Sequence, residues 1–255
     1  ITVRDWSSDV CSSDLQFHLQ VRVAGIGQGR VLILIEDHTA ARRVEAMRRD
    51  FVANVSHELK TPVGAIQLLA ETVEVGADDP DFVRDYSGRM RKEARRLGVL
   101  VQEIIELTRL QEGDALAEPE VVDIDAVVAE AVDRVRVEAD GSQIALVAGG
   151  TQGLRVRGDS ALITTAVRNL LDNAIRYSEP RTRVSVGVSL DAEDPDIVRI
   201  AVVDQGIGIP KEEQERVFER FYRVDKARSR ATGGTGLGLS IVKHVAADHG
   251  GAVEL

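Results

Sequence analysis

Residues 51–62 read Phe-Val-Ala-Asn-Val-Ser-His-Glu-Leu-Lys-Thr-Pro, and the apolar positions of this stretch continue beyond it at helical spacing. The series advances by three or four residues at each step: Phe51, Val55, Leu59, Pro62, Ile66, Leu69 and Val73. This spacing is typical of a helix that buries one stripe of its surface in a bundle. Asp37 or Thr39 can cap the helix, because a short oxygen-bearing side chain accepts from the N–H groups of the first turn.

A second series with the same spacing follows a turn at residues 76–80. Its members are Val83, Tyr86, Met90, Ala94, Leu97, Val101, Ile104 and Thr108. Two long helices with a short connection form an antiparallel hairpin. Because one pair of helices encloses no core, we expect a four-helix bundle built from two chains.

His57 lies on the wrong face of the first helix for a core residue. At ~100° per residue it points about 155° away from the mean direction of the apolar series, and Thr61 lies one turn further along the same outer face. A solvated surface histidine is the simplest interpretation. A zinc site of the His-Glu-x-x-His type is excluded, because position 61 is Thr. What remains is nucleophilic attack by a neutral imidazole on a phosphoryl group, with Glu58 orienting the ring or taking its proton.

The pattern changes after Gly113 and predicts a second, mixed domain. Alternating or continuous apolar residues indicate strands at 144–148, 154–157, 184–190 and 197–203, and helical spacing covers 124–137, 159–177 and 239–248. Asp159 is placed to cap the middle helix, and Pro62 is expected to bend the first helix of the hairpin. The order of elements indicates a mixed sheet with helices packed on it.

Three features of this second domain suit a nucleotide. Asn169, Asn173 and Arg176 share the polar side of the helix 159–177, where amide oxygens suit Mg²⁺ and a guanidinium suits phosphate. Asp204 ends a strand beside flexible glycines and can accept the amine of an adenine. Residues 233–240 are rich in glycine and open a helix, whose first N–H groups bind anions.

Each of these features has a simpler explanation when taken alone. The helix side could be a solvated face, and Asp204 with Gly206 could be an ordinary turn. The glycines form neither a Rossmann fingerprint, since Lys211 replaces the third glycine, nor a Walker loop, since no Gly-Lys-Ser/Thr follows. However, residues 216–230 carry six basic and two acidic side chains, a local charge of 6 − 2 = +4 in a chain of −10, which suits a polyanion.

Composition excludes several other classes. The chain has 255 residues, 44% of them hydrophobic and 29% charged, which is typical of a folded globular protein. One cysteine excludes a disulfide scaffold and a cysteine-rich zinc site. Its acidity argues against a nucleic-acid partner, and no run of ~18 apolar residues is present that could span a bilayer.

Both ends of the sequence look atypical. Residues 1–15 repeat Ser-Ser-Asp and show no strand or helix period, so we expect a non-native or disordered segment there. Residues 16–23 alternate as a strand and residues 31–35 form a second one. From residue 250 the sequence indicates a turn and the beginning of a strand, which predicts that the last strands of the domain are missing.

Five stretches together resemble the sensor histidine kinases of two-component systems. Residues 51–62 are similar to the H-box of this family, residues 169–178 to the N-box, and residues 204–210 to the first glycine box. Phe218-Glu-Arg-Phe-Tyr-Arg223 resembles the F-box, and Gly234-Thr-Gly-Leu-Gly-Leu239 the second glycine box. The H-box and the segment 227–234 look most like actinobacterial phosphate-regulon sensor kinases of the PhoR type. Residues 16–38 resemble the terminal β-hairpin of a PAS sensor domain.

The resemblance implies roles for individual residues. His57 would be phosphorylated, Glu58 would be its base, and Thr61 would position water for dephosphorylating a response regulator. Asn173, helped by Asn169, would hold Mg²⁺. The implied ATP-binding residues are Asn169, Asn173, Arg176, Tyr177, Asp204, Gly206, Gly208, Arg223, Gly234, Thr235, Gly236, Leu237, Gly238 and Leu239. Among these Arg176 stands where many relatives have Lys, so its geometry differs.

The expected fold is α+β, a two-helix hairpin of a dimeric bundle followed by a Bergerat-type α/β sandwich that binds ATP. The predicted divisions are 1–15, the PAS-like hairpin 16–38, the phosphoacceptor hairpin 39–113 and the catalytic domain 114–255. The implied partners are a second copy of the chain and a receiver domain, and the implied location is the cytoplasmic portion of a bacterial kinase anchored in the plasma membrane by upstream segments. Two alternatives stay open: an ATPase like those of gyrases and chaperones, and a non-catalytic dimeric binding module.

Overall fold

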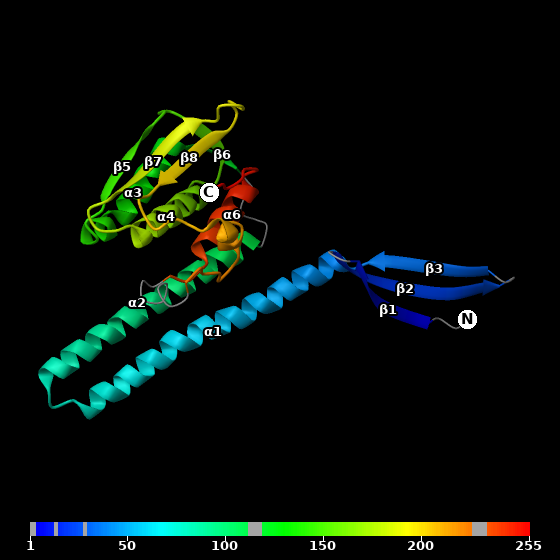
Figure 1. Cartoon of the computed structure of the whole chain (residues 1–255), viewed down its shortest axis with the longest axis horizontal. Helices are drawn as coiled ribbons and strands as arrows, with labels where there is room; N and C mark the ends of the chain where they lie inside the picture. Colours follow the sequence, from blue (N-terminus) through cyan, green and yellow to red (C-terminus); the bar gives the residue numbers. More distant parts are fainter. Residues whose placement is uncertain (1–3, 13–14, 28–29, 112–118, 226–233) are drawn as a thin grey trace. The chain divides into compact units, whose positions relative to one another are not determined.

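The computed structural model describes residues 4–12, 15–27, 30–111, 119–225 and 234–255 (Figure 1). It divides into two compact units, Ile1–Glu58 and Leu59–Leu255. Among the described residues, no helix combines the length and the apolar character needed to cross a membrane. The predicted functional boundaries after residues 38 and 113 stay predictions.

The first unit contains a three-stranded antiparallel sheet in the order β1-β2-β3, formed by β1 (Arg4–Ser12), β2 (Leu15–Gly27) and β3 (Arg30–Asp37). The two predicted strands are confirmed, and both are longer than predicted. The expectation that residues 1–15 stand outside the fold is wrong for β1, which pairs with β2 along its whole length. Backbone hydrogen bonds hold this pairing and require no alternation of side chains, so the sequence pattern did not reveal it.

Helix α1 (Thr39–Val75) begins where the sequence places its cap. Asp37 Oδ1 accepts from the N–H of Thr39 at 2.8 Å, and Thr39 Oγ1 accepts from the N–H of His18 on β2 at 2.8 Å. Asp37 is therefore the cap, as one of the two predictions had it, whereas Thr39 is the first residue of the helix and ties it to the sheet. The helix continues through Pro62.

The second helix of the hairpin is α2 (Pro80–Gln111), capped by Asp79, which accepts from the N–H groups of Asp81 and Phe82 at 3.0 and 3.2 Å. The first apolar series is buried or half-buried along α1, as expected. The second series is only partly right, because Ala94 and Val101 are exposed. Towards the end of α2 the buried positions are instead Leu100, Leu107 and Leu110. The burial follows the surface that α2 turns towards the following domain.

The domain after the hairpin contains two sheets and three α-helices among its described residues. A two-stranded antiparallel sheet pairs β4 with β6, and a three-stranded sheet has the order β5-β7-β8, with β5 parallel and β8 antiparallel to β7. The elements are β4 (Glu120–Asp123), α3 (Ile124–Gly141), β5 (Ala145–Gly150), β6 (Arg155–Gly158), α4 (Ser160–Tyr177), β7 (Arg183–Leu190), β8 (Val198–Val203), the 3₁₀ turns η1 (Lys211–Glu213) and η2 (Arg216–Phe218), and α6 (Gly238–Asp248). This is the mixed sheet that the sequence predicts.

Helices α3 and α4 cover one face of the larger sheet (Figure 1). The alternation in β7 places Val184, Val186 and Val188 in this core, each at most 5% exposed, against Leu171 of α4. Asp159 caps α4 as predicted and accepts from the N–H of Leu162 at 2.9 Å.

Three details differ from the sequence prediction. Strand β4 was not predicted, because its four residues are too short to show a period. Strand β8 alternates between half-buried and exposed residues rather than being fully buried, since within the described sheet it lies at the edge. Residues 252–255 form no strand.

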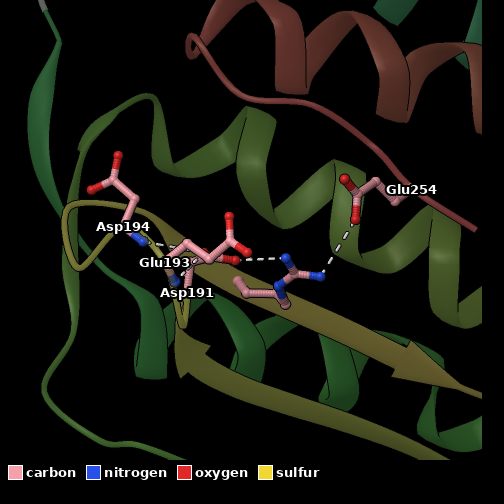
Figure 2. Close-up of polar contacts among 5 residues, drawn as sticks. Asp191, Glu193, Asp194 and Glu254 are labelled. Atoms are coloured by element: carbon pink, nitrogen blue, oxygen red, sulfur yellow. Dashed lines mark hydrogen bonds and ion pairs between the residues drawn. The ribbon is translucent and has the colours of Figure 1, made fainter.

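An ion pair cluster holds the loop between β7 and β8. Arg199 on β8 donates to Asp191 Oδ2 at 2.6 Å and to Glu254 Oε2 at 3.4 Å. Figure 2 shows Asp191, Glu193 and Asp194 together on this loop and Glu254 on the C-terminal segment, on the other side of the arginine that it contacts. The hydrogen bond from Arg199, with those from the N–H groups of Glu193 and Asp194, lowers the pKa of Asp191 to about 2. The C-terminal segment is therefore attached to the sheet.

We expect Leu171→Ala to destabilise the domain by about 2–5 kcal/mol, because the side chain is 1% exposed and its removal leaves a cavity in the core. Leu190→Ala, in a residue that is 44% exposed, is the matched control and should cost less than about 1 kcal/mol. Urea unfolding followed by circular dichroism measures both. Equal losses in the two variants would show that Leu171 is not part of the core.

Candidate functional site

The candidate nucleophile of α1 is displayed as predicted. His57 is exposed and Glu58 is half-buried at the end of the first unit, and Thr61 is exposed one helical turn after His57. An exposed imidazole on a regular helix is accessible to a reagent and is held by a rigid backbone. The exposed imidazole is thus placed to accept a group that is delivered from outside its own helix.

The amides of α4 converge on the first residue of α6. A Cβ placed on Gly238 would lie 3.1 Å from Asn169 Oδ1 and 3.7 Å from Asn173 Nδ2. Asn169 is 5% exposed, and its Nδ2 donates to the carbonyl of Thr165 at 3.0 Å. This bond fixes the amide so that its oxygen faces Gly238. Glycine suits this position, because a side chain would press on the Asn169 amide.

This cradle fits the predicted magnesium site. A hard cation takes amide and phosphate oxygens, and Asn169 presents a fixed oxygen beside the amide of Asn173. No group of three His, Cys, Asp or Glu side chains that could hold a metal occurs in the described ranges. A cation held here would therefore take only part of its ligands from the protein and the rest from a nucleotide and water.

Arg176 follows on the same side of α4 and is half-buried. Its Nε is buried and has no hydrogen-bond partner among the residues that the structure describes. An unsatisfied guanidinium nitrogen is costly, and an added phosphate would satisfy it. The position therefore suits the predicted phosphate contact.

A carboxylate of α2 lies beside this guanidinium and was not predicted. Burial raises the pKa of Glu103 to about 7, and the raising effect of Glu106 is opposed by a hydrogen bond with Thr235 and by the charges of Arg176 and Arg168. Glu103 Oε2 has no hydrogen-bond partner within the described part of the chain. The end of α2 thus places a proton-binding group next to two residues of the predicted ATP site.

A second ion pair joins α2 to α4. Arg168 lies 3.5 Å from Glu106 and 3.8 Å from Asp172, which is one turn later on α4. Burial raises the pKa of Asp172 to about 6, Glu138 raises it further, and Arg168 and Arg176 lower it. Arg176 therefore interacts with two carboxyl groups, those of Glu103 and Asp172, whose pKa values are raised by burial.

The first glycine box lies at the C-terminal end of α4. Asp204 is exposed, and its Oδ1 accepts from the N–H of Gly206 at 2.7 Å. A Cβ on Gly206 would lie 2.6 Å from the carbonyl oxygen of Tyr177, so only glycine allows this approach. Gly208 has a φ of +69°, which also favours glycine. Asp204 thus forms the turn of the simpler interpretation, and its side chain is exposed.

The F-box is attached to the second glycine box by two hydrogen bonds. The N–H of Phe221 donates to the carbonyl of Gly236 at 2.8 Å, and Arg223 donates to the carbonyl of Thr235 at 2.8 Å. Both Phe221 and Gly236 have positive φ, at +62° and +79°. The predicted residues Gly234, Thr235 and Leu237 are buried, and Gly236, Gly238 and Leu239 are half-buried. Gly233 and most of the segment 227–234 lie outside the described residues.

Helix α6 begins without a side-chain cap, in contrast to α3 and α4, which Asp123 and Asp159 cap. Leu237 precedes the helix, and its N–H donates to Thr235 Oγ1 at 3.3 Å. The N–H groups at the start of α6 are thus left to an anion, as the glycine-rich sequence suggests.

The structure therefore brings together the N-box amides, Arg176, the F-box arginine Arg223 and the second glycine box, within one domain. Sequence reasoning missed Glu103, Glu106 and the salt bridge of Glu106 with Arg168. Glu103 lies off the apolar series of α2, where the pattern predicts only a solvated surface. The charged residues Arg168 and Asp172 of α4 were a signal in the sequence that a charged residue packs against this helix.

Two families match the chain in the order that the five stretches predict. Residues 47–113 match the His Kinase A (phospho-acceptor) domain, and residues 158–255 match the histidine kinase-, DNA gyrase B-, and HSP90-like ATPase. The chain belongs to the sensor histidine kinase family. The helical hairpin and the mixed α/β domain are the two parts of that family.

Curated relatives extend the match over nearly the whole chain. A sensor-like histidine kinase SenX3 of Mycolicibacterium smegmatis is 54% identical over 88% of this chain and 58% of its own length. The phosphate regulon sensor protein PhoR of Pseudomonas aeruginosa is 33% identical over 94% of this chain and 53% of its own length. The chain thus spans less than two thirds of the length of these sensor kinases. Their names agree with the predicted resemblance to PhoR-type sensors.

Solved structures show the same fold. The Acinetobacter baumannii histidine kinase AdeS covers 75% of this chain and 86% of its own, with 23% identity and a TM-score of 0.59. The histidine kinase ThkA, solved in complex with the response regulator protein TrrA, covers 97% of this chain and 72% of its own, with 21% identity and a TM-score of 0.60.

We predict that Glu103 makes the stability of the second unit fall as pH rises from about 4.5 to 7. Its folded pKa of about 7 lies above the ordinary 4.5, so the folded state holds the proton more tightly and loses this advantage as the proton leaves. Glu103→Gln should raise the melting temperature at pH 8 and flatten its dependence on pH over this window. Glu71→Gln, at an exposed position of α1, is the control. An unchanged pH slope in Glu103→Gln would contradict the assignment.

Proposed function

We propose that the chain is the kinase portion of a sensor histidine kinase that transfers the γ-phosphoryl group of ATP to His57. The observation that carries this proposal is the convergence of the Asn169 and Asn173 amides on the uncapped start of α6, beside the buried guanidinium of Arg176. The exposed His57 supplies the acceptor. Asp204 would accept the amine of adenine, with Tyr177 near the nucleoside.

The proposed reaction forms one bond and breaks another at the γ-phosphorus. A ring nitrogen of His57 attacks with its lone pair, and the bond from the γ-phosphorus to the bridging oxygen breaks to release ADP. Glu58 accepts the ring proton. Catalysis of this kind is mostly positioning and charge neutralisation. Arg176, Arg223 and the N–H groups at the start of α6 would hold the phosphates.

Magnesium would neutralise phosphate charge when bound, and Asn169 and Asn173 are the residues that would hold it. The match to the ATPase family supports ATP as the nucleotide. The Asn169 Oδ1 that faces Gly238 supports a cation there, because a neutral amide oxygen is a ligand that a hard cation takes.

The phosphoryl group would pass from His57 to an aspartate of a response regulator receiver domain, and Thr61 would position water for dephosphorylating that regulator. The relative ThkA was solved with its response regulator, which supports a partner of this class. A homodimer would complete the four-helix bundle, because Leu68 and Val75 of α1 are 65% and 91% exposed. Upstream PAS and membrane segments would belong to the longer protein.

Incubating the chain with ATP labelled at the γ-phosphorus should give an acid-labile phosphoprotein. We expect His57→Gln to abolish the label, because the proposed acceptor nitrogen is removed, and His38→Gln to retain it. Label that survives in His57→Gln would reject the proposed acceptor. Release of free phosphate without protein labelling would favour the gyrase- and chaperone-like ATPase, and the absence of nucleotide binding by the folded chain would favour a binding module.

Asn173→Ala should weaken the dependence of nucleotide binding on Mg²⁺. In the natural chain we expect Mg²⁺ to tighten binding of a fluorescent ATP analogue, and in the variant this gain should fall about tenfold, the effect of one lost ligand interaction. Asn169 can be tested in the same titration. An exposed control, Gln152→Ala, should leave the Mg²⁺ effect intact. A variant that keeps the full effect would remove Asn173 from the magnesium site.

A further inference from the structure

His244 of α6 and His249, the C-cap residue of that helix, make the same pair of hydrogen bonds. In each, Nδ1 faces the carbonyl of the residue four positions earlier: His244 lies 2.9 Å from Ser240 O, and His249 lies 2.7 Å from Val245 O. In each, Nε2 faces a group that can only donate. Arg220 of the F-box lies 2.9 Å from His244 Nε2, and the N–H of Asp159 lies 3.0 Å from His249 Nε2.

These partners determine the state of both rings. A guanidinium and a backbone N–H have no lone pair to accept a proton, so Nε2 must be the acceptor. A carbonyl cannot donate, so Nδ1 must carry the proton. Both imidazoles are therefore neutral and share one tautomer. The groups that face the rings are the Arg220 cation on one side and the N-cap residue Asp159 on the other.

The partners of the two rings, Asp159 and Arg220, belong to segments that lead into the proposed nucleotide site. Asp159 caps α4, whose later turns carry Asn169, Asn173 and Arg176. A Cβ on Gly158 would collide with the ring of His249, which shows how closely the ring packs on the chain at the start of α4. Arg220 is followed by Phe221, whose N–H donates to Gly236. Burial lowers the pKa of Arg220, so its guanidinium needs the acceptor that His244 offers.

Helix α6 contacts α4 near both of its ends, among other places. Its first residue, Gly238, meets Asn169, and its C-terminal cap, His249, meets Asp159. The two contacts are separated by ten residues on α4 and eleven on α6, or about 15 Å along either helix at 1.5 Å per residue. The helices therefore run antiparallel, and fixing His249 sets where along α6 the Asn169 amide lies.

We propose that His244 and His249 are positioning residues of the nucleotide site, which hold the F-box and the start of α4 on helix α6 as neutral imidazoles protonated at Nδ1. They touch neither the nucleotide nor its phosphates and act through Arg220 and Asp159. The proposal rests on the proposed function, because the site that they position is the ATP site.

The tautomer is tested first, in the unmodified full chain. Long-range ¹H–¹⁵N spectra distinguish the Nδ1-protonated ring, the Nε2-protonated ring and the imidazolium, and single His→Gln variants assign the five histidines. We expect the Nδ1-protonated pattern for His244 and His249 at neutral pH. The Nε2-protonated pattern or an imidazolium at either position would overturn the proposal without any binding measurement.

The role in positioning is tested with paired substitutions. We expect His249→Leu and His244→Leu each to weaken binding of a fluorescent ATP analogue about tenfold, the effect of one hydrogen bond that no longer holds the site. His249→Gln and His244→Gln place an amide oxygen near the position of Nε2 and should stay within about threefold of the unmodified chain. His38→Leu is the matched control and should bind normally.

The outcomes separate this inference from the proposed function. Failure of the unmodified chain to bind the nucleotide would refute the ATP site itself. Normal binding by the Leu variants, or equal losses in the Leu and Gln variants, would refute the positioning role while leaving the ATP site intact. If a Leu variant does not fold, the spectra and the binding of the Gln variants decide the question.

Discussion

The contact between Gly238 and Asn169 is the constraint on which the catalytic domain depends. Gly238 lets the start of α6 approach α4 closely, since a Cβ there would lie 3.1 Å from Asn169 Oδ1, and the amide of Asn169 is fixed by its bond to Thr165. This approach brings the uncapped N–H groups of α6, the amides of the N-box and the second glycine box into one place. A methyl group at Gly238 would press on the Asn169 amide, which would have to shift by a few tenths of an ångström.

The same site concentrates charge that the protein alone does not balance. Arg176 has a buried Nε without a hydrogen-bond partner in the described chain, and Glu103 and Asp172 near it have pKa values raised to about 7 and about 6, with burial as the main cause. Desolvated groups of both signs are expensive to bury. A phosphate group would compensate the guanidinium, and a proton compensates each carboxyl group. The Arg176 Nε is therefore the group of this cluster that an anion would satisfy.

The sequence predicted the elements that depend on local chemistry. Asp159 and Asp37 were recognised as caps, the valines of β7 as one buried face, and His57 as exposed, because each follows from spacing or from one side chain. It did not predict β1, β4, the switch of burial to Leu100, Leu107 and Leu110, or the approach of Glu103 to Thr235. These features are created by partners distant in the chain, and no local pattern encodes them. The glycines of the two glycine boxes were recognised as phosphate-binding candidates. The close packing of Gly158 against the ring of His249 was not predicted.

Two different devices keep α6 in place, and their difference has a physical reason. At its beginning the helix has no side-chain cap, and Gly238 lies close to the Asn169 amide. Along its length and at its end it can use side chains, and imidazole suits this purpose. The ring has few rotatable bonds, and its Nδ1 is anchored to a carbonyl of the same helix, so Nε2 points outward in a fixed direction. A lysine in the same place could only donate, and both Arg220 and the Asp159 N–H need an acceptor. These two partners thus call for an acceptor at each position, which the imidazole Nε2 supplies.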